Sequence, residues 1–142
     1  MKNVMILLAT LLLTGLLTVA KAQSVEKMNK EVFLEKIWDF EQNKEWKYKG
    51  TKPVIIDMYA DWCGPCKKLS PILEQIQKDF GDKLQIYKVN TDQERLLAQL
   101  FQVSSIPLLI FIPVEGRPIA VAGLRPQADL EKIIAEQLQV KK

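Results

Sequence analysis

The apolar positions of the chain fall into runs that predict alternating strands and helices. The continuous run Val54–Tyr59 is typical of a buried strand, and the looser alternation from Leu84 to Val89 indicates a second strand. Between them, residues 64–80 carry apolar side chains at helical spacing. Pro71 is expected to kink this helix, and Gly81 to end it. The right-handed crossover rule makes the two strands of this βαβ unit parallel.

Two further helices are predicted, one before and one after this unit. Residues 29–47 place apolar side chains at positions i, i+4 and i+7, which indicates an amphipathic helix. These side chains are Phe33, Ile37 and Phe40. Thr91 followed by Glu94 three residues on is a capping-box pattern. The helix that it starts would bury Leu96, Leu97, Leu100 and Phe101.

The last third of the chain predicts a hairpin and a final helix. Two short apolar segments, Leu108–Ile112 and Ile119–Ala122, are joined by a connection that contains Gly116. Pro126 stands at the expected first position of the helix. That helix would bury Leu130, Ile133, Ile134 and Leu138. These elements predict one α/β domain with a central mixed sheet flanked by helices.

The first 22 residues have the pattern of a secretory signal. Lys2 precedes an uncharged run from Asn3 to Ala20, and Ala20-Lys21-Ala22 supplies the small residues of a cleavage site. We therefore expect a signal peptide at 1–22, a domain at 23–142, and a periplasmic or otherwise extracytoplasmic location. The alternative is an uncleaved membrane anchor, because an uncharged run of 18 residues reaches the lower edge of spanning length.

The composition mainly excludes classes of function. The chain has 142 residues, 48% apolar and 26% charged, which suits one globular domain. Without Lys2 and Lys21, 18 of the 20 basic residues remain against 17 acidic ones, and no basic cluster with interleaved aromatics predicts nucleic-acid binding. The absence of histidine removes Ser-His-Asp and Cys-His pairs and leaves too few soft ligands for a structural zinc site. We expect no metal, no bound cofactor and no nucleic-acid partner.

The two cysteines of the chain stand in Trp62-Cys63-Gly64-Pro65-Cys66, directly after the first predicted strand. A free thiol with a pKa near 8.5 is only about 3% ionised at pH 7, and the thiolate is the form that attacks disulfides. At a helix N-terminus, unpaired amides and the helix dipole would favour the Cys63 anion by about 0.3–1 kcal/mol. Lowering the thiol pKa to about 7 takes about 2 kcal/mol, so hydrogen bonds from the amide and thiol of Cys66 are expected to supply the rest.

The spacing assigns the two sulfurs different roles. Cys63, at the exposed end, would attack a substrate disulfide, and Cys66, one turn further into the helix, would resolve the mixed disulfide. The alternative is a purely structural disulfide. Loop-closure entropy gives about 1.9 kcal/mol for so short a ring and about 3 kcal/mol for a loop of about 15 residues, so a structural disulfide would sit better across a longer loop. The pattern favours thiol–disulfide exchange.

Asp57 is the second informative residue, because it lies in the middle of an otherwise apolar strand, six positions before Cys63. Alternation alone allows an outward, solvated acid or an inward one beneath the cysteine pair. In the inward position, desolvation would raise the pKa of Asp57 and suit it to exchange protons with Cys66. Lys88 is the candidate neighbour across the parallel strands, although a lone lysine in a strand is commonly just exposed.

The motif and its surroundings resemble the thioredoxin family. The family signature Trp-Cys-Gly-Pro-Cys-Lys stands at 62–67, and the resemblance extends over nearly all of residues 30–139. Four more family features match: the buried acid, the lysine beside it, the helix kink and the glycine beside the substrate groove. These fall at Asp57, Lys88, Pro71 and Gly123. The resemblance favours burial of Asp57.

The resemblance also implies a substrate-binding surface around a cis-proline loop at Ile106-Pro107. Sequence alone argues for a trans bond, since only about 5–6% of such bonds are cis in folded proteins. In the family, this loop offers backbone groups to an extended substrate segment. The implied docking residues are Trp62, Gly64, Pro65, Ile106, Pro107 and Gly123. Tyr59 and Leu108 replace a frequent tryptophan and a frequent threonine of the family, which affects substrate choice.

The resemblance implies a protein thiol:disulfide oxidoreductase. The Gly-Pro dipeptide between the cysteines is similar to reducing members, whereas oxidant and isomerase relatives usually carry histidine there. We expect a monomer that reduces protein disulfides in exported proteins, with a membrane thiol–disulfide carrier as electron donor. The alternatives are an oxidase or isomerase on the same scaffold, and a non-catalytic binding module with a structural disulfide.

Overall fold

The computed structural model describes residues 23–142, so the predicted signal peptide at 1–22 lies outside the described residues. Five strands form one mixed sheet in the order β1-β3-β2-β4-β5. The strands are β1 (Glu26–Lys27), β2 (Val54–Tyr59), β3 (Gln85–Asn90), β4 (Leu108–Ile112) and β5 (Ile119–Ala122). β2 is parallel to β3, and β4 is antiparallel to β2 and β5. The predicted βαβ unit and hairpin are confirmed.

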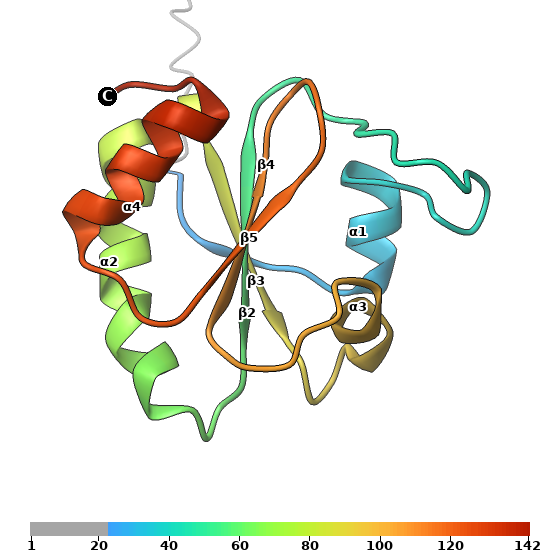
Figure 1. Ribbon diagram of the computed structural model, residues 1–142, viewed down its shortest axis with the longest axis horizontal. Helices are drawn as coiled ribbons and strands as arrows, with labels where there is room; N and C mark the ends of the chain where they lie inside the picture. The colour runs from blue at the N-terminus through green and yellow to red at the C-terminus, as the bar shows by residue number, and fades with distance from the viewer. Residues whose placement is uncertain (1–22) are drawn as a thin grey trace, which may run out of the picture.

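Helices cover both faces of the sheet (Figure 1). On one face lie α2 (Gly64–Phe80) and α4 (Gln127–Ile133), which continues as a π-helical turn over Ile134–Leu138. On the other face lie α1 (Lys30–Lys36) and α3 (Arg95–Leu100). A short 3-10 turn, Gly81–Lys83, follows α2. Within 23–142, no helix is both long and apolar enough to span a membrane. The predicted α/β class, a mixed sheet flanked by helices, is confirmed.

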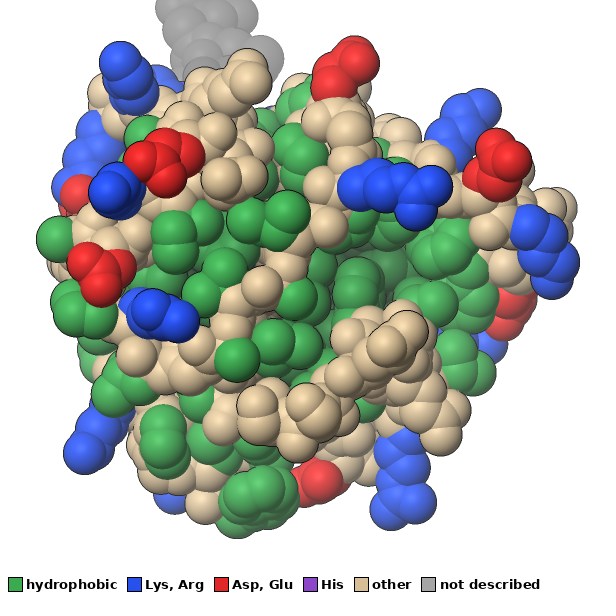
Figure 2. Space-filling model, viewed as in Figure 1, with side chains coloured by type: hydrophobic (Ala, Val, Ile, Leu, Met, Phe, Trp, Pro, Cys, Tyr) green, Lys and Arg blue, Asp and Glu red, His purple; other side chains and the backbone are tan. Residues whose placement is uncertain are grey.

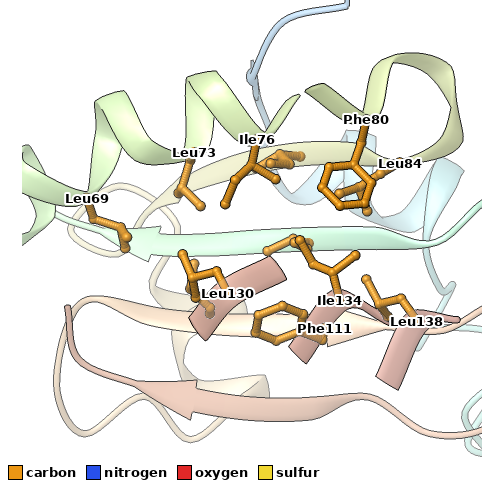
Figure 3. Close-up of a cluster of buried hydrophobic side chains, with 12 residues drawn as sticks. Leu69, Leu73, Ile76, Phe80, Leu84, Phe111, Leu130, Ile134 and Leu138 are labelled. Carbon is orange, nitrogen blue, oxygen red and sulfur yellow. The ribbon is translucent and has the colours of Figure 1, made fainter. Parts of the chain in front are cut away.

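Alternation along β2 divides its side chains between two apolar clusters. Ile55 packs with α2 and α4, whereas Ile56 and Met58 pack with α1 and α3. In Figure 3, side chains of the first cluster converge from α2, α4 and β4. Those labelled include Leu69, Leu73, Ile76, Phe111, Leu130 and Ile134. Because Asp57 lies two positions after Ile55, it faces α2.

The predicted helix over 29–47 is wrong beyond its first two turns. α1 ends at Lys36, and the chain then runs as turns and irregular backbone to β2. Lys49 returns to the end of the helix: its amide donates to the Ile37 carbonyl at 2.9 Å and its Nζ to the Leu34 carbonyl at 2.8 Å. The carbonyls at the end of α1 are therefore satisfied by a distant segment instead of by further helix.

The predicted capping box at Thr91 is also wrong. The N-cap of α3 is Glu94, and it makes no side-chain capping bond. Instead, Thr91 Oγ1 donates to the Tyr59 carbonyl at 3.2 Å, and Glu94 Oε2 accepts the Lys30 amide at 3.0 Å. Both side chains bond to other elements, which a local pattern cannot indicate.

Three further details differ from the sequence predictions. Leu96 is 47% exposed instead of buried. Pro126 is the N-cap of α4, one position ahead of its predicted place. The two-residue strand β1 was not predicted, because so short a segment carries no periodicity.

A buried amide network fixes the end of α2 against β3. Gln77 has no exposed surface, and its Nε2 donates to the carbonyls of Gly81 (3.1 Å) and Leu84 (2.8 Å). Its Oε1 accepts the Ile86 amide at 2.6 Å. These bonds hold α2 to the sheet at the end away from the cysteines, so they help to set where its first turn lies.

We expect Gln77→Leu to lower the free energy of unfolding by about 2–4 kcal/mol, because buried backbone groups lose their partner. Chemical denaturation measures the difference. Gln75→Leu is the matched control: Gln75 is exposed and bonds only to the Asp79 side chain, so its loss should stay within about 0.5 kcal/mol. Equal losses in the two variants would contradict a structural role for this network.

Candidate functional site

Cys63 and Cys66 form a disulfide where β2 gives way to α2. Cys63 is the N-cap of α2, and Pro65 lies in its first turn. The Cys66 amide donates to Cys63 Sγ at 3.2 Å, so this sulfur takes the acceptor place that a serine or aspartate oxygen fills at most helix starts. The sulfur of Cys63 therefore lies at the positive end of a 17-residue helix.

Both cysteines are buried in this disulfide form, with 3% of Cys63 and 4% of Cys66 exposed. The prediction of an exposed Cys63 is therefore wrong for this form. Ala60, Tyr59 and Ile106 pack around the pair and cover it. Apolar atoms reach the surface at this end of the molecule, at the lower edge of Figure 2. Among residues 23–142, the neighbouring Trp62 is the most exposed large apolar side chain, at 71%.

Asp57 is buried, with 4% of its surface exposed, and it stands opposite Lys88 in the parallel register of β2 and β3. Of the two alternatives for Asp57, solvated on the outside or inward beneath the cysteine pair, the structure shows the inward one. Burial raises the pKa of Asp57 to about 7 because it disfavours the carboxylate, and the Lys88 ammonium opposes this effect. Asp57 Oδ1 is buried and accepts no hydrogen bond from the part of the chain that is described.

A pocket of about 130 Å³ is shared by the buried acid and the resolving cysteine. Its lining comes from β2, the turn after β2, the first turns of α2, and β3. It is lined by Asp57, Tyr59, Ala60, Asp61, Cys66, Lys67, Ser70 and Lys88. A larger hollow of about 440 Å³, near Tyr48 and Tyr87, includes none of the predicted site residues. Pocket size alone therefore does not locate this site.

The Ile106–Pro107 peptide bond is cis, as the resemblance implies. Ile106 packs against the cysteine pair, and the Pro107 carbonyl accepts the Gly123 amide at 2.9 Å. Gly123 has φ +87°, a left-handed conformation that favours glycine, and no atom would obstruct a Cβ there. The backbone conformation, and not lack of space, accounts for glycine at this position. The bond brings the end of β5 to the proline loop.

Trp62 is held by Asp92, a residue that the sequence analysis did not identify. Trp62 Nε1 donates to Asp92 Oδ2 at 2.9 Å across a separation of 30 residues. Asn90 supports this contact, because its Oδ1 accepts the Asp92 amide at 3.0 Å and its Nδ2 donates to Asp61 Oδ2 at 3.2 Å. No local pattern signals such contacts, since they join two loops that meet only in the folded chain.

The predicted residues thus fall into two groups around the disulfide. Asp57 and Lys88 lie beneath it. The others lie on its outer side: Trp62, Gly64 and Pro65 are exposed, Ile106 and Gly123 are half-buried, and Pro107 is buried. Residues 23–142 contain no group of three or more His, Cys, Asp or Glu that could hold a metal ion. A dithiol pair over a buried acid is suited to two-electron exchange coupled to proton transfer.

Comparison with known proteins agrees with this geometry. The family model described as Thioredoxin matches residues 24–136. The thioredoxin of Borreliella burgdorferi is 41% identical over 109 residues, which cover 77% of this chain and 93% of the relative. The thioredoxin of Alicyclobacillus acidocaldarius is 37% identical over 98 residues, which cover 68% and 92%.

Among solved structures, the crystal structure of chloroplastic thioredoxin z has a similar fold, with a TM-score of 0.67. The likeness covers 80% of this chain and 93% of that one at 23% identity, so it concerns the fold alone. The family model covers most of the chain, and the bacterial relatives match along nearly their whole length. The chain therefore belongs to the thioredoxin family, and it is a thiol–disulfide oxidoreductase.

Proposed function

We propose that this protein reduces disulfide bonds of other exported proteins through Cys63 and Cys66. The observation that carries the proposal is the place of the Cys63 sulfur, which caps α2 and accepts the Cys66 amide at 3.2 Å. Once the disulfide is reduced, that amide and the helix dipole stabilise a thiolate at Cys63. Cys66 has no such position, because it lies one turn inside the helix.

In the proposed reaction the Cys63 thiolate attacks one sulfur of a substrate disulfide, whose S–S bond breaks and releases the first substrate thiol. Cys66 then loses its proton to the Asp57 carboxylate, and its sulfur attacks Cys63 Sγ. The mixed disulfide breaks, the second substrate sulfur leaves with the bonding electrons and takes up a proton, and the Cys63–Cys66 disulfide remains. Two electrons pass from the enzyme to the substrate. The two released substrate sulfurs take up protons from solvent, and Asp57 later returns the Cys66 proton to solvent.

The buried Asp57 suits this proton transfer. With a pKa of about 7, it exists in both protonation states near neutral pH, so it accepts and returns a proton readily. Lys88, paired in register with Asp57, keeps a positive charge near the carboxylate that forms when the proton leaves. We propose that these two residues assist Cys66 and not Cys63, because it is Cys66 that shares their pocket.

We propose that the substrate docks as an extended segment beside the cis-proline loop. Trp62 offers a large exposed apolar surface next to Cys63, and its bond to Asp92 fixes the ring in place. The Gly123 amide already bonds to the Pro107 carbonyl, so the backbone of Ile106 is the group left to pair with a substrate strand. Apolar contact with backbone pairing favours unfolded protein segments over small disulfides.

The extracytoplasmic location rests on the signal-like pattern of residues 1–22. Outside the cytosol, a reductase works against an oxidising environment and needs a source of electrons. We propose a membrane thiol–disulfide carrier as that source, and a monomer as the working form.

The Cys66→Ser variant is expected to hold substrates as stable mixed disulfides at Cys63, because the resolving sulfur is missing. Non-reducing electrophoresis and mass spectrometry of the full chain from its own cells identify the captured proteins, which should carry export signals. The Cys63→Ser, Cys66→Ser double variant is the control and should capture none. A folded Cys66→Ser protein that captures nothing would contradict the enzyme and favour a structural disulfide. Captured proteins without export signals would contradict the location.

The reduction potential separates a reductase from an oxidase. Equilibration with dithiol buffers, followed by alkylation of the free thiols, should give a reduction potential of about −270 mV, the value of reducing family members. A potential of about −120 mV would show that the reduced form is stabilised, and would assign the protein to disulfide formation instead.

The Asp57→Asn variant tests the buried acid through stability. A folded-state pKa of about 7 against the ordinary 3.8 means that the folded protein binds more protons between these values. The wild type therefore loses stability as pH rises from about 4 through 7, up to about 4 kcal/mol in all, and the variant does not. Denaturation of both proteins between pH 4 and 8 measures the difference.

Asp82→Asn is the matched control, because Asp82 is exposed in the turn after α2. Its stability difference from the wild type should be small and independent of pH. If the Asp57→Asn difference is equally flat, the carboxyl does not titrate near neutral pH in the folded protein.

A further inference from the structure

We propose that Ser70 is a catalytic residue in the resolving step: its hydroxyl, with water in the pocket, passes the proton of Cys66 to Asp57. This inference rests on the proposed function and adds a residue to it. No feature of the sequence motif indicates Ser70, which lies seven positions after Cys63 on α2.

The helix places Ser70 beside the resolving cysteine. Residues four apart on a helix lie on the same face, so Ser70 follows Cys66 one turn along α2. The neighbouring inward positions Leu69 and Leu73 are fully buried and apolar. Ser70 is half-buried and lines the pocket together with Cys66 and Asp57. The same pocket is therefore lined by the sulfur-bearing Cys66, a hydroxyl on the next turn of α2 and the acid on the strand.

The buried carboxyl of Asp57 needs a hydrogen-bond partner. Asp57 Oδ1 is buried and accepts no hydrogen bond from residues 23–142, and buried polar atoms in proteins nearly always have a partner. A pocket of about 130 Å³ with polar groups in its lining has room for water. A hydroxyl donates and accepts at once, so Ser70 can link Cys66 to such water and so to Asp57.

The other groups that face the pocket are less suited to this transfer. Lys88 from β3 and Lys67 from α2 carry donors and no acceptor, so neither passes a proton on. Asp61, in the turn after β2, is exposed to solvent. Tyr59 also lines the pocket and is the competing hydroxyl, which the Tyr59→Phe variant separates from Ser70.

The step balances in protons and electrons. The S–H bond of Cys66 breaks, Ser70 Oγ takes that proton and gives its own to water, and water protonates the Asp57 carboxylate. The electron pair left on Cys66 forms the bond to Cys63 Sγ, and the pair of the broken mixed disulfide leaves with the substrate sulfur. That sulfur takes up a proton from solvent, and Ser70 ends unchanged.

Stopped-flow reduction of an aromatic disulfide with coloured leaving thiolates tests the proposal, because the reduced enzyme releases two thiolates in turn. The first release reports attack by Cys63 and the second reports resolution by Cys66. In Ser70→Ala, the second release should slow roughly tenfold near pH 6–7 and recover at high pH, where Cys66 ionises directly to solvent. The first release should not change. Ser70→Thr, which keeps the hydroxyl, should restore the wild-type pH profile.

Two more variants complete the experiment. Ser24→Ala removes an exposed serine far from the pocket and should match the wild type. Tyr59→Phe removes the competing hydroxyl and should leave the pH profile of the second release in place. The proposal is overturned if Ser70→Ala keeps the wild-type profile, if Ser70→Thr behaves like Ser70→Ala, or if Tyr59→Phe alone shifts the profile. Loss of the first release in the wild type would overturn the proposed function instead.

Discussion

The packing of α2 on the sheet is the interaction on which the site depends. Leu69, Leu73 and Ile76 are buried against β2, β3 and α4, and Gln77 bonds to the turn that follows. Because these contacts fix the helix along its length, they also fix where its first turn begins. Cys63 then becomes the N-cap, and Cys66 is placed over the strand below. The redox chemistry of the pair is a consequence of this apolar contact.

Burying the carboxyl of Asp57 between α2 and the sheet costs free energy of desolvation. Its neighbours on β2 are apolar, and a leucine at its place would bury more apolar surface without a desolvation penalty. Burial instead raises the pKa of Asp57, and Asp57 Oδ1 accepts no hydrogen bond from residues 23–142. This is a local conflict with the fold of the kind that marks functional sites. In the proposed mechanism, the pocket that Asp57 shares with Cys66 makes this carboxyl the proton acceptor of the resolving step.

The outer side of the disulfide is built from loops that follow separate strands. Trp62 comes after β2, Asp92 after β3, Ile106 before β4 and Gly123 after β5. Parallel strands end at one edge of a sheet, and the antiparallel β4 begins there, so the topology gathers these four loops. Hydrogen bonds from Trp62 to Asp92 and from Gly123 to Pro107 then join them in pairs.

The sequence by itself determined the elements with strong periods and the chemistry of the motif. The bounds of β2, α2, β4 and β5 follow from apolar runs and from Gly81, because those signals are local. Only the tertiary structure decided the rest. α1 ends earlier than predicted, and Lys49 bonds to the Leu34 carbonyl near its end. Thr91 Oγ1 donates to the Tyr59 carbonyl instead of capping α3. The face of Asp57, the burial of Cys63, the bond from Trp62 to Asp92 and the proposed role of Ser70 depend on residues far apart in the chain. A local pattern carries no information about such partners.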